Sequence, residues 1–307
     1  MNRFLGRNPQ QAIGVGIIVF FVLSLATGLV VWLRSTAPIG GPGDLCAVGR
    51  LLRHRIVLID ATDNLDATQR ETVLEAVEDL ARISEPSDKL TVATVDAAHP
   101  REPHILFSAC APQSKVEGIA DNPAFIRINW LRIFYNPLLE AVSTAMNQPE
   151  QKQTPLIESI YGLGRRSDFG PAVADRRLFI VSDMLQNTAS LYSLYSDSLD
   201  FKVFAARPDA FQNVPDLTGV EVVNLYIDRP NDRCIQGEAQ RQFWVDFFHS
   251  ARTEIRFENW PWPKSTATLH EYCRGARSSQ GLRRGRHHRW RWHIFARRTR
   301  APSPFPP

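Results

Sequence analysis

Motifs of the common hydrolase and nucleotide-binding classes are absent from this 307-residue sequence. It contains no GxSxG segment, which carries the nucleophile of α/β-hydrolases, and no HExxH segment, which binds zinc in metalloproteases. It also lacks a glycine-rich phosphate loop. The four cysteines are too few for a disulfide scaffold and form no CxxC pair, which excludes the common zinc and thiol-redox motifs. The sequence therefore favours a binding or structural role over catalysis.

Acidic residues are missing from the end of the chain. Residues 274–307 contain ten Arg, no Lys and no acidic residue, so the formal net charge of +4 leaves −6 on residues 1–273. A segment with this net negative charge lacks the basic surface that binds nucleic acid, and we expect no nucleic-acid partner. Residues 260–307 show no regular apolar period and predict an irregular, disordered basic tail. A basic arm for nucleic acid or anionic lipid, with Trp290 and Trp292 available for stacking, is the less favoured alternative.

One long run without charge, residues 12–33, lies near the start of the chain. A helix of this length, at about 1.5 Å per residue, crosses the ~30 Å hydrocarbon core of a bilayer. Trp32 and Arg34 close the run as an interfacial aromatic and a stop charge do. A cleaved signal peptide is the alternative, but its apolar region is shorter, about 7–15 residues, and ends in a small-x-small site. We predict a retained transmembrane helix.

Positive residues flank the predicted membrane helix almost equally on its two sides. A short leader, residues 1–11, is easily kept in the cytoplasm. We therefore expect a bacterial inner-membrane protein whose C-terminal domain lies in the periplasm, joined by a Pro/Gly-rich linker at residues 34–54. An exported domain is expected to form one disulfide among the four cysteines, whereas a cytoplasmic domain would keep buried free thiols.

Strands and helices alternate along residues 55–259. Apolar runs predict strands at residues 55–60, 89–96, 104–109, 176–183, 201–206 and 220–227, with an edge strand at 253–259. Helical spacing predicts helices at residues 70–83, 125–146, 156–164 and 237–250, the first capped by Asp66 or Thr68. The connection between residues 96 and 104 is too short for a crossover, so its two strands should pair antiparallel. The pattern predicts an open, mostly parallel α/β sheet with helices on both faces.

Two of the predicted strands end in aspartate. Asp60 and Asp183 follow apolar runs directly, at the strand ends where open α/β sheets bind ligands. Asp60, Thr62 and Asn64 alternate along the first of these loops, so three side-chain oxygens could face one crevice. Mg²⁺ prefers such oxygen ligands. For either Asp alone, a turn-forming or capping role is the simpler interpretation.

The segment DATDN at residues 60–64 resembles the Asp-x-Ser-x-Ser signature of von Willebrand factor A domains, the first loop of their metal-ion-dependent adhesion site. In that family a Thr on a later loop and an Asp after the fourth strand complete the site. Thr154 and Asp183 are at the matching positions, and the resemblance covers residues 55–255. The segment VSDMLQ, together with the first loop, is also similar to bacterial membrane proteins of this superfamily.

The resemblance implies a von Willebrand A / Rossmann-like fold and a bound Mg²⁺ (or Mn²⁺ or Ca²⁺). The implied metal ligands are Asp60, Thr62, Asn64, Thr154 and Asp183. Thr62 and Asn64 replace the two serines of the signature, so the site is a degenerate form of the family pattern. The family's strand order also implies that the third strand runs opposite to the first. Cys110 would then lie near Cys46, and a disulfide between them is implied.

These features together predict a membrane-anchored protein-binding or scaffold module that engages an unidentified protein partner through the metal. One alternative is a metal-dependent phosphatase of the haloacid dehalogenase type, which also begins with an Asp after its first strand. That family needs a second Asp two residues later, where this chain has Thr62. The other alternative is a structural envelope protein with a non-functional metal site.

Overall fold

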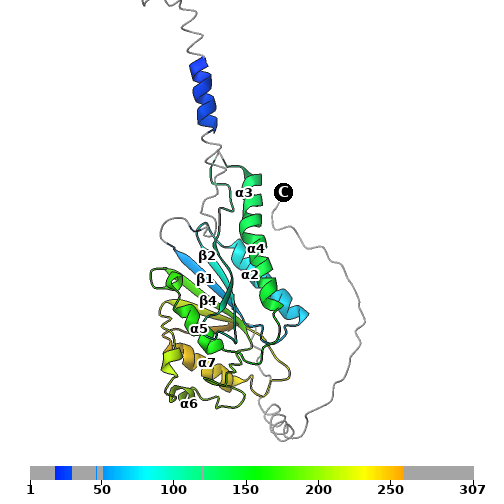
Figure 1. The fold of residues 1–307 in the computed structure, drawn as a ribbon, viewed down its shortest axis with the longest axis vertical. Coiled ribbons are helices and arrows are strands. Elements are labelled where there is room, and N and C mark those ends of the chain that lie inside the picture. Colours follow the sequence, from blue (N-terminus) through cyan, green and yellow to red (C-terminus); the bar gives the residue numbers. More distant parts are fainter. Residues whose placement is uncertain (1–17, 30–45, 47–50, 119–120, 259–307) are drawn as a thin grey trace, which may run out of the picture. The chain divides into compact units, whose positions relative to one another are not determined.

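The structure, a computed structural model, describes residues 18–29, 46, 51–118 and 121–258 (Figure 1). Its strands are β1 (Arg53–Ile59), β2 (Lys89–Thr94), β3 (His104–Cys110), β4 (Asp175–Ser182), β5 (Val220–Tyr226) and β6 (Ile255–Glu258). Its helices are α2 (Ala67–Arg82), α3 (Pro123–Trp130), η1 (Leu131–Tyr135), α4 (Asn136–Met146), α5 (Leu156–Gly164), η2 (Ser167–Phe169), α6 (Phe201–Ala205), η3 (Phe211–Asn213) and α7 (Glu238–Ser250).

The strands form one sheet in the order β3-β2-β1-β4-β5-β6. Every neighbouring pair is parallel except β2 and β3, which are antiparallel. The open, mostly parallel sheet predicted from the sequence is thus confirmed, including its one antiparallel pair. Because β1, β4 and β5 are parallel and adjacent, their carboxyl ends lie side by side. The line formed by these strand ends is the carboxyl edge of the sheet.

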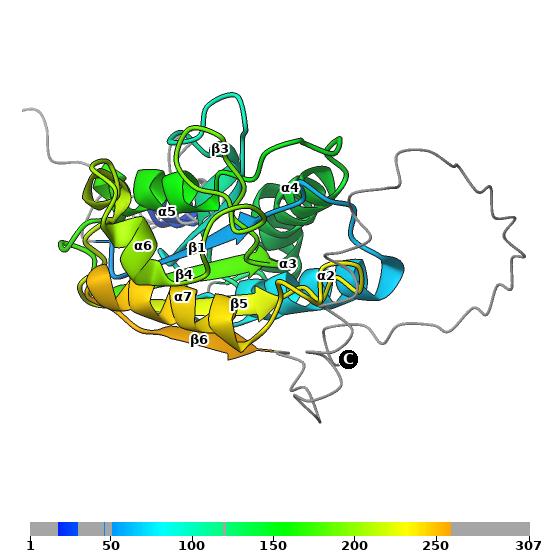
Figure 2. The ribbon, with the colours of Figure 1, turned by 90° about the horizontal axis from the view of Figure 1, so that it is seen from below.

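Two hydrophobic cores cover the two faces of the sheet, because successive side chains of a strand point to opposite faces. Ile56 and Leu58 of β1 pack into one core with α5, α6 and α7. Val57 and Ile59 pack into the other with α2 and α4. Figure 2 shows these two groups of helices on either side of the sheet.

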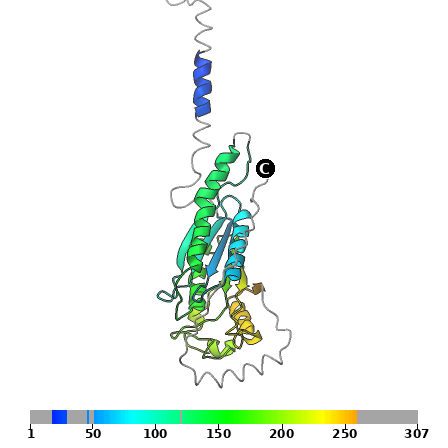
Figure 3. The same ribbon diagram turned by 90° about the vertical axis from the view of Figure 1, so that its right-hand side faces the viewer.

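A single helix was predicted over residues 125–146, and Figure 3 shows one continuous helical segment there. It consists of α3, the π-helical turn η1 and α4. Pro137 lies at the start of α4 and has no N–H to donate. The N–H of Asn136 instead bonds to the carbonyl of Leu131, five residues back, which is the π pattern. Proline therefore changes the hydrogen bonding without breaking the helix.

The strand predicted over residues 201–206 is wrong, because this segment forms the short helix α6. The Asp200 carboxylate caps it by accepting from the N–H of Lys202 at 2.9 Å. Phe201 and Phe204, three residues apart, then share one face and pack on Phe243, each with ring centroids 5.8 Å from that ring. A short apolar run is compatible with either element, and here the tertiary contact decides.

Only part of the predicted membrane helix at residues 12–33 is described. Residues 18–29 are helical with exposed side chains. Within the described stretches of the chain, no helix is both long enough and apolar enough to cross a bilayer. The leader, the remainder of residues 12–33 and the basic tail lie outside the described residues.

The disulfide that the family resemblance implied is present between Cys46 and Cys110. Cys110 ends β3 and is paired with Lys89, which is itself paired with His54 at the start of β1. The antiparallel direction of β3 therefore brings Cys110 to the amino end of β1. The disulfide therefore links Cys46, which precedes β1 in the chain, to the end of β3.

His54 is fully buried at this end of the sheet. Its Nδ1 lies 2.8 Å from the carbonyl oxygen of Asp168 and its Nε2 lies 2.8 Å from Oγ1 of Thr91. A carbonyl can only accept, so Nδ1 carries the proton and Nε2 accepts from the Thr91 hydroxyl. Burial disfavours the charged imidazolium and lowers the pKa of His54 from 6.5 to about 4.

This lowered pKa predicts a loss of stability in acid. The unfolded chain binds the proton below pH 6.5, whereas the folded chain binds it only near pH 4. The contribution is present above pH 6.5 and falls by up to about 3 kcal/mol as pH decreases to about 4. We expect the stability advantage of wild type over His54→Asn, measured by urea unfolding, to shrink across this range. His104→Asn, at an exposed position, is the control. A wild-type advantage over His54→Asn that is constant with pH would contradict the assignment.

Candidate functional site

Asp60 lies immediately after β1, at the carboxyl edge of the sheet, and is buried. Its N–H donates to the carbonyl of Val181 at 2.9 Å, which extends the pairing of β1 with β4 by one residue. Its Oδ1 accepts from the hydroxyl of Thr62 at 2.8 Å and from the Thr62 N–H at 3.2 Å. Its Oδ2 accepts from the hydroxyl of Ser182 at 2.7 Å. The carboxylate is therefore held in one orientation by its own loop and by the end of β4.

Thr62 and Thr154 meet in this site, although 92 residues separate them in sequence. Their hydroxyl oxygens are 2.8 Å apart, and both residues are buried. Backbone bonds hold the two loops together, because the N–H of Gln151 donates to the carbonyl of Thr62 at 2.9 Å. Thr154 is fixed further by paired backbone bonds with Asn187. The two hydroxyls and the Asp60 carboxylate form one continuous chain of hydrogen bonds.

Asp183 follows β4 and supplies the second buried carboxylate. Its Oδ1 accepts from the N–H of Leu185 and its Oδ2 from Nε of Arg229, each at 2.9 Å. Burial and the negative charge of Asp60 raise the pKa of Asp183 to about 7, against the opposing effect of Arg229. Burial likewise raises the pKa of Asp60. The negative charge of Asp60 thus acts on Asp183 across the ends of β1 and β4.

Arg229 is the main residue that sequence reasoning missed. It comes from the loop after β5, and its side chain is only 14% exposed. Besides Asp183, its guanidinium donates to the carbonyls of Asn64 at 2.6 Å and Asp63 at 3.2 Å. Arg229 follows the carboxyl end of a parallel strand, as Asp60 and Asp183 do. The same principle, that ligand-binding residues follow the carboxyl ends of parallel strands, therefore also indicates Arg229.

Asn64 is the one predicted site residue that the structure does not bring to the others. Its side chain is exposed, and its amide donates to Oε1 of Glu150 at 2.6 Å. Ser182 was not predicted, yet its hydroxyl binds Asp60 directly. The four predicted residues that do converge are Asp60, Thr62, Thr154 and Asp183.

The topology agrees with what the resemblance implied, and four of the five implied site residues lie together. β3 is antiparallel at one edge of the sheet, and the Asp loop, the Thr loop and the second Asp meet at the carboxyl edge. In its order of elements and in these four residues, the domain resembles von Willebrand factor A domains.

Comparisons with known proteins find solved structures that resemble this domain at low sequence identity. No family model matches the chain, and no curated protein does. One solved structure with a similar fold is a von Willebrand factor type A protein from Catenulispora acidiphila, 13% identical with a TM-score of 0.38. Its match covers 73% of this chain, which spans 42% of that protein's length. Another is the conserved hypothetical protein BatB from Bacteroides thetaiotaomicron, 12% identical with a TM-score of 0.36, covering 75% of this chain and 100% of BatB.

The donor chemistry of the A-like site suits a hard divalent cation. Its four side chains offer two carboxylates and two hydroxyls, the oxygen ligands that Mg²⁺ and Mn²⁺ accept. Two buried carboxylates share one guanidinium, so ionisation of both leaves one negative charge uncompensated. In the parts of the chain that the structure describes, no three His, Cys, Asp or Glu side chains gather as a metal-binding group. Any ion here would therefore depend on the threonines.

The Thr62 hydroxyl links both halves of the site, and removing it should destabilise the fold. Thr62→Val keeps the shape of the side chain but leaves Asp60 Oδ1 and the Thr154 hydroxyl each short of a buried partner. We expect a loss of about 1–3 kcal/mol in the free energy of unfolding, measured by urea denaturation. Thr68→Val, at an exposed position in α2, should change it by less than about 0.5 kcal/mol. Equal effects of the two variants would argue against the network.

Proposed function

We propose that this chain is a membrane-anchored protein-binding module. Residues 12–33 anchor it, residues 34–54 form a linker, and the A-like domain binds a protein partner at the carboxyl edge of its sheet. The observation that carries the proposal is the convergence of Asp60, Thr62, Thr154 and Asp183 at that edge, with two buried carboxylates and one compensating guanidinium.

A divalent cation at this edge would offer a coordination position to an acidic residue of the partner. Asp60, Thr62, Thr154 and Asp183 are the residues that would hold it. Asn64 joins them only if its amide leaves Glu150. Thr62 and Thr154 already place their hydroxyls against each other, so little side-chain rearrangement is needed on that side.

Arg229 competes for the same negative charge. Its Nε occupies Oδ2 of Asp183, and its other nitrogens hold the backbone of residues 63 and 64. A cation that uses Asp183 therefore has to draw this carboxylate away from the guanidinium. Wild-type affinity for metal should accordingly be lower than that of a variant in which Arg229 is neutral.

The Cys46–Cys110 disulfide supports a periplasmic location for the domain. Disulfides persist in oxidising compartments and are rare in the reducing cytosol. A periplasmic domain with a short cytoplasmic leader is consistent with the single anchor at residues 12–33.

Thermal unfolding of the full-length chain with chelator, and then with millimolar Mg²⁺ or Mn²⁺, tests the site. A cation that binds only the folded state raises its stability, by about 2.7 kcal/mol at a hundredfold excess over Kd. We expect a rise in Tm for wild type, a larger rise for Arg229→Gln, and none for Asp60→Asn.

Two neighbouring substitutions serve as matched controls. Asp63→Asn removes an exposed carboxylate from the same loop as Asp60, and Arg233→Gln removes an exposed guanidinium from the same loop as Arg229. Both controls should respond to metal as wild type does. If neither wild type nor Arg229→Gln is stabilised by any divalent ion, the metal-dependent form of the proposal fails.

A further inference from the structure

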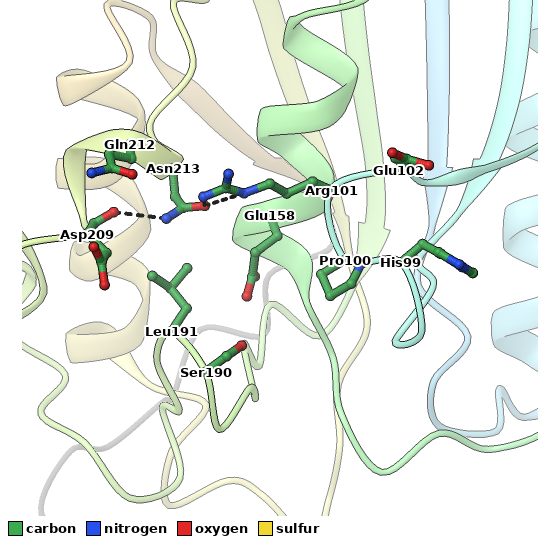
Figure 4. A pocket seen from close by; sticks show the side chains of 10 residues that line it. All are labelled: His99, Pro100, Arg101, Glu102, Glu158, Ser190, Leu191, Asp209, Gln212 and Asn213. Atoms are coloured by element: carbon green, nitrogen blue, oxygen red, sulfur yellow. Dashed lines mark hydrogen bonds between the residues drawn. The ribbon is translucent and has the colours of Figure 1, made fainter.

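A second site lies apart from the carboxylate pair. A cavity of about 450 Å³ opens between the β2–β3 connection, α5, the loop after β4 and the segment at η3 (Figure 4). Its lining residues are His99, Pro100, Arg101, Glu102, Glu158, Ser190, Leu191, Asp209, Gln212 and Asn213. Its volume is in the range of about 300–1,000 Å³ that is typical of small-molecule sites. None of the five predicted metal ligands lines it.

The walls of the cavity are fixed by contacts of their own. A Cβ on Gly162 of α5 would lie 2.0 Å from the carbonyl oxygen of Arg101, so only glycine lets the β2–β3 connection pack this closely. The guanidinium of Arg101 donates to Oδ1 of Asn213 at 2.9 and 3.2 Å, across to η3. Asn213 in turn donates to the carbonyl of Asp209 at 2.9 Å. The cavity is therefore preformed.

Glu158 lies in the first turn of α5, on the inner wall, and is only 4% exposed. Its carboxylate accepts from Nε2 of Gln186 at 3.0 Å, from Oγ1 of Thr188 at 2.9 Å and from its own backbone N–H. A carboxylate can accept about four hydrogen bonds, so acceptor capacity remains. Across the described part of the chain, no cationic side chain forms a salt bridge with Glu158. It is a buried carboxylate that has hydrogen bonds without an ion-pair partner.

Arg101, the one Lys or Arg among the lining residues, is directed elsewhere. Its guanidinium is held by Asn213 and lies 5.3 Å from the centroid of the Tyr161 ring. Figure 4 shows the Glu158 carboxylate directed away from Arg101 into the space between Pro100 and Leu191, with Ser190 beyond it. Three carboxylates, Glu102, Glu158 and Asp209, line a cavity that has this single guanidinium. The cavity is thus net negative, with an apolar passage leading to its buried acid.

We propose that this cavity binds a primary alkylammonium group, with the ammonium against Glu158 and its aliphatic stem between Pro100 and Leu191. An ammonium supplies the positive partner that the Glu158 carboxylate lacks, and it can donate hydrogen bonds to the unused lone pairs of the carboxylate oxygens. A stem of several methylenes suits the apolar passage, as it does for lysine side chains elsewhere. The group belongs either to a lysine of a protein or to a free alkylamine, which present the same chemistry.

Calorimetric titration of the full-length chain with n-butylammonium tests the proposal, with n-butanol as a neutral molecule of equal stem length. We expect saturable binding of the cation and none of the alcohol. Glu158→Gln, which keeps the hydrogen-bonding shape, should weaken binding by at least about tenfold. Glu102→Gln removes an exposed carboxylate of the same cavity and should weaken it by less than about threefold. Equal binding of the cation by wild type and Glu158→Gln, or no saturable binding, would overturn the proposal.

A second variant keeps the test independent of Glu158 and of its role in the fold. Ser190→Lys changes an exposed loop residue beside the carboxylate and supplies a tethered ammonium. It should abolish butylammonium binding while the Tm stays within a few degrees of wild type. Undiminished binding in this variant would place the cation elsewhere and also overturn the proposal. Titrations with a blocked Gly-Lys-Gly peptide and with cadaverine then distinguish the source. Tighter binding of the peptide indicates a protein lysine, and tighter binding of cadaverine indicates a free amine.

Discussion

Asp60 and Asp183 are two buried carboxylates, the negative charge of Asp60 raises the pKa of Asp183, and the carboxyl edge of the sheet is organised around that pair. Burial of an uncompensated ion costs several kcal/mol, so such a pair persists only with donors and cations around it. Thr62 and Ser182 supply hydroxyls to Asp60, and Arg229 supplies the positive charge to Asp183. Each of these partners comes from a different strand end or loop. The charges therefore determine how the loops are joined.

The loop after β4 connects the carboxylate pair to the cavity that contains Glu158. Asp183 begins it, Asn187 pairs with Thr154 through the backbone, and Gln186 and Thr188 hold Glu158. Trp244 and Gln240 of α7 donate to the carbonyl of Met184 at 2.8 and 2.9 Å, which fixes the start of the loop from beneath. The two sites thus share one segment, residues 183–188, which hydrogen bonds hold along its length.

Much of this arrangement could be predicted from the sequence, because local rules decide it. The strand-end rule identified Asp60 and Asp183, and a connection too short for a crossover gave the antiparallel pair. What failed depends on contacts distant in sequence. The segment at 201–206 is helical because Phe201 and Phe204 meet Phe243 of a later helix. The helix predicted over residues 125–146 contains the π turn η1, which helical spacing alone does not distinguish from an ordinary turn.

Arg229 links the second buried carboxylate of the site to the backbone of the first loop. Its Nε binds the second aspartate, and its terminal nitrogens bind the carbonyls of Asp63 and Asn64. A carbonyl fixed in this way sets the backbone of the first loop, and the side chain of Asn64 then faces Glu150 at the surface. The same guanidinium thus supplies positive charge beside Asp183 and holds the backbone of Asn64, the residue whose side chain is turned away from the site.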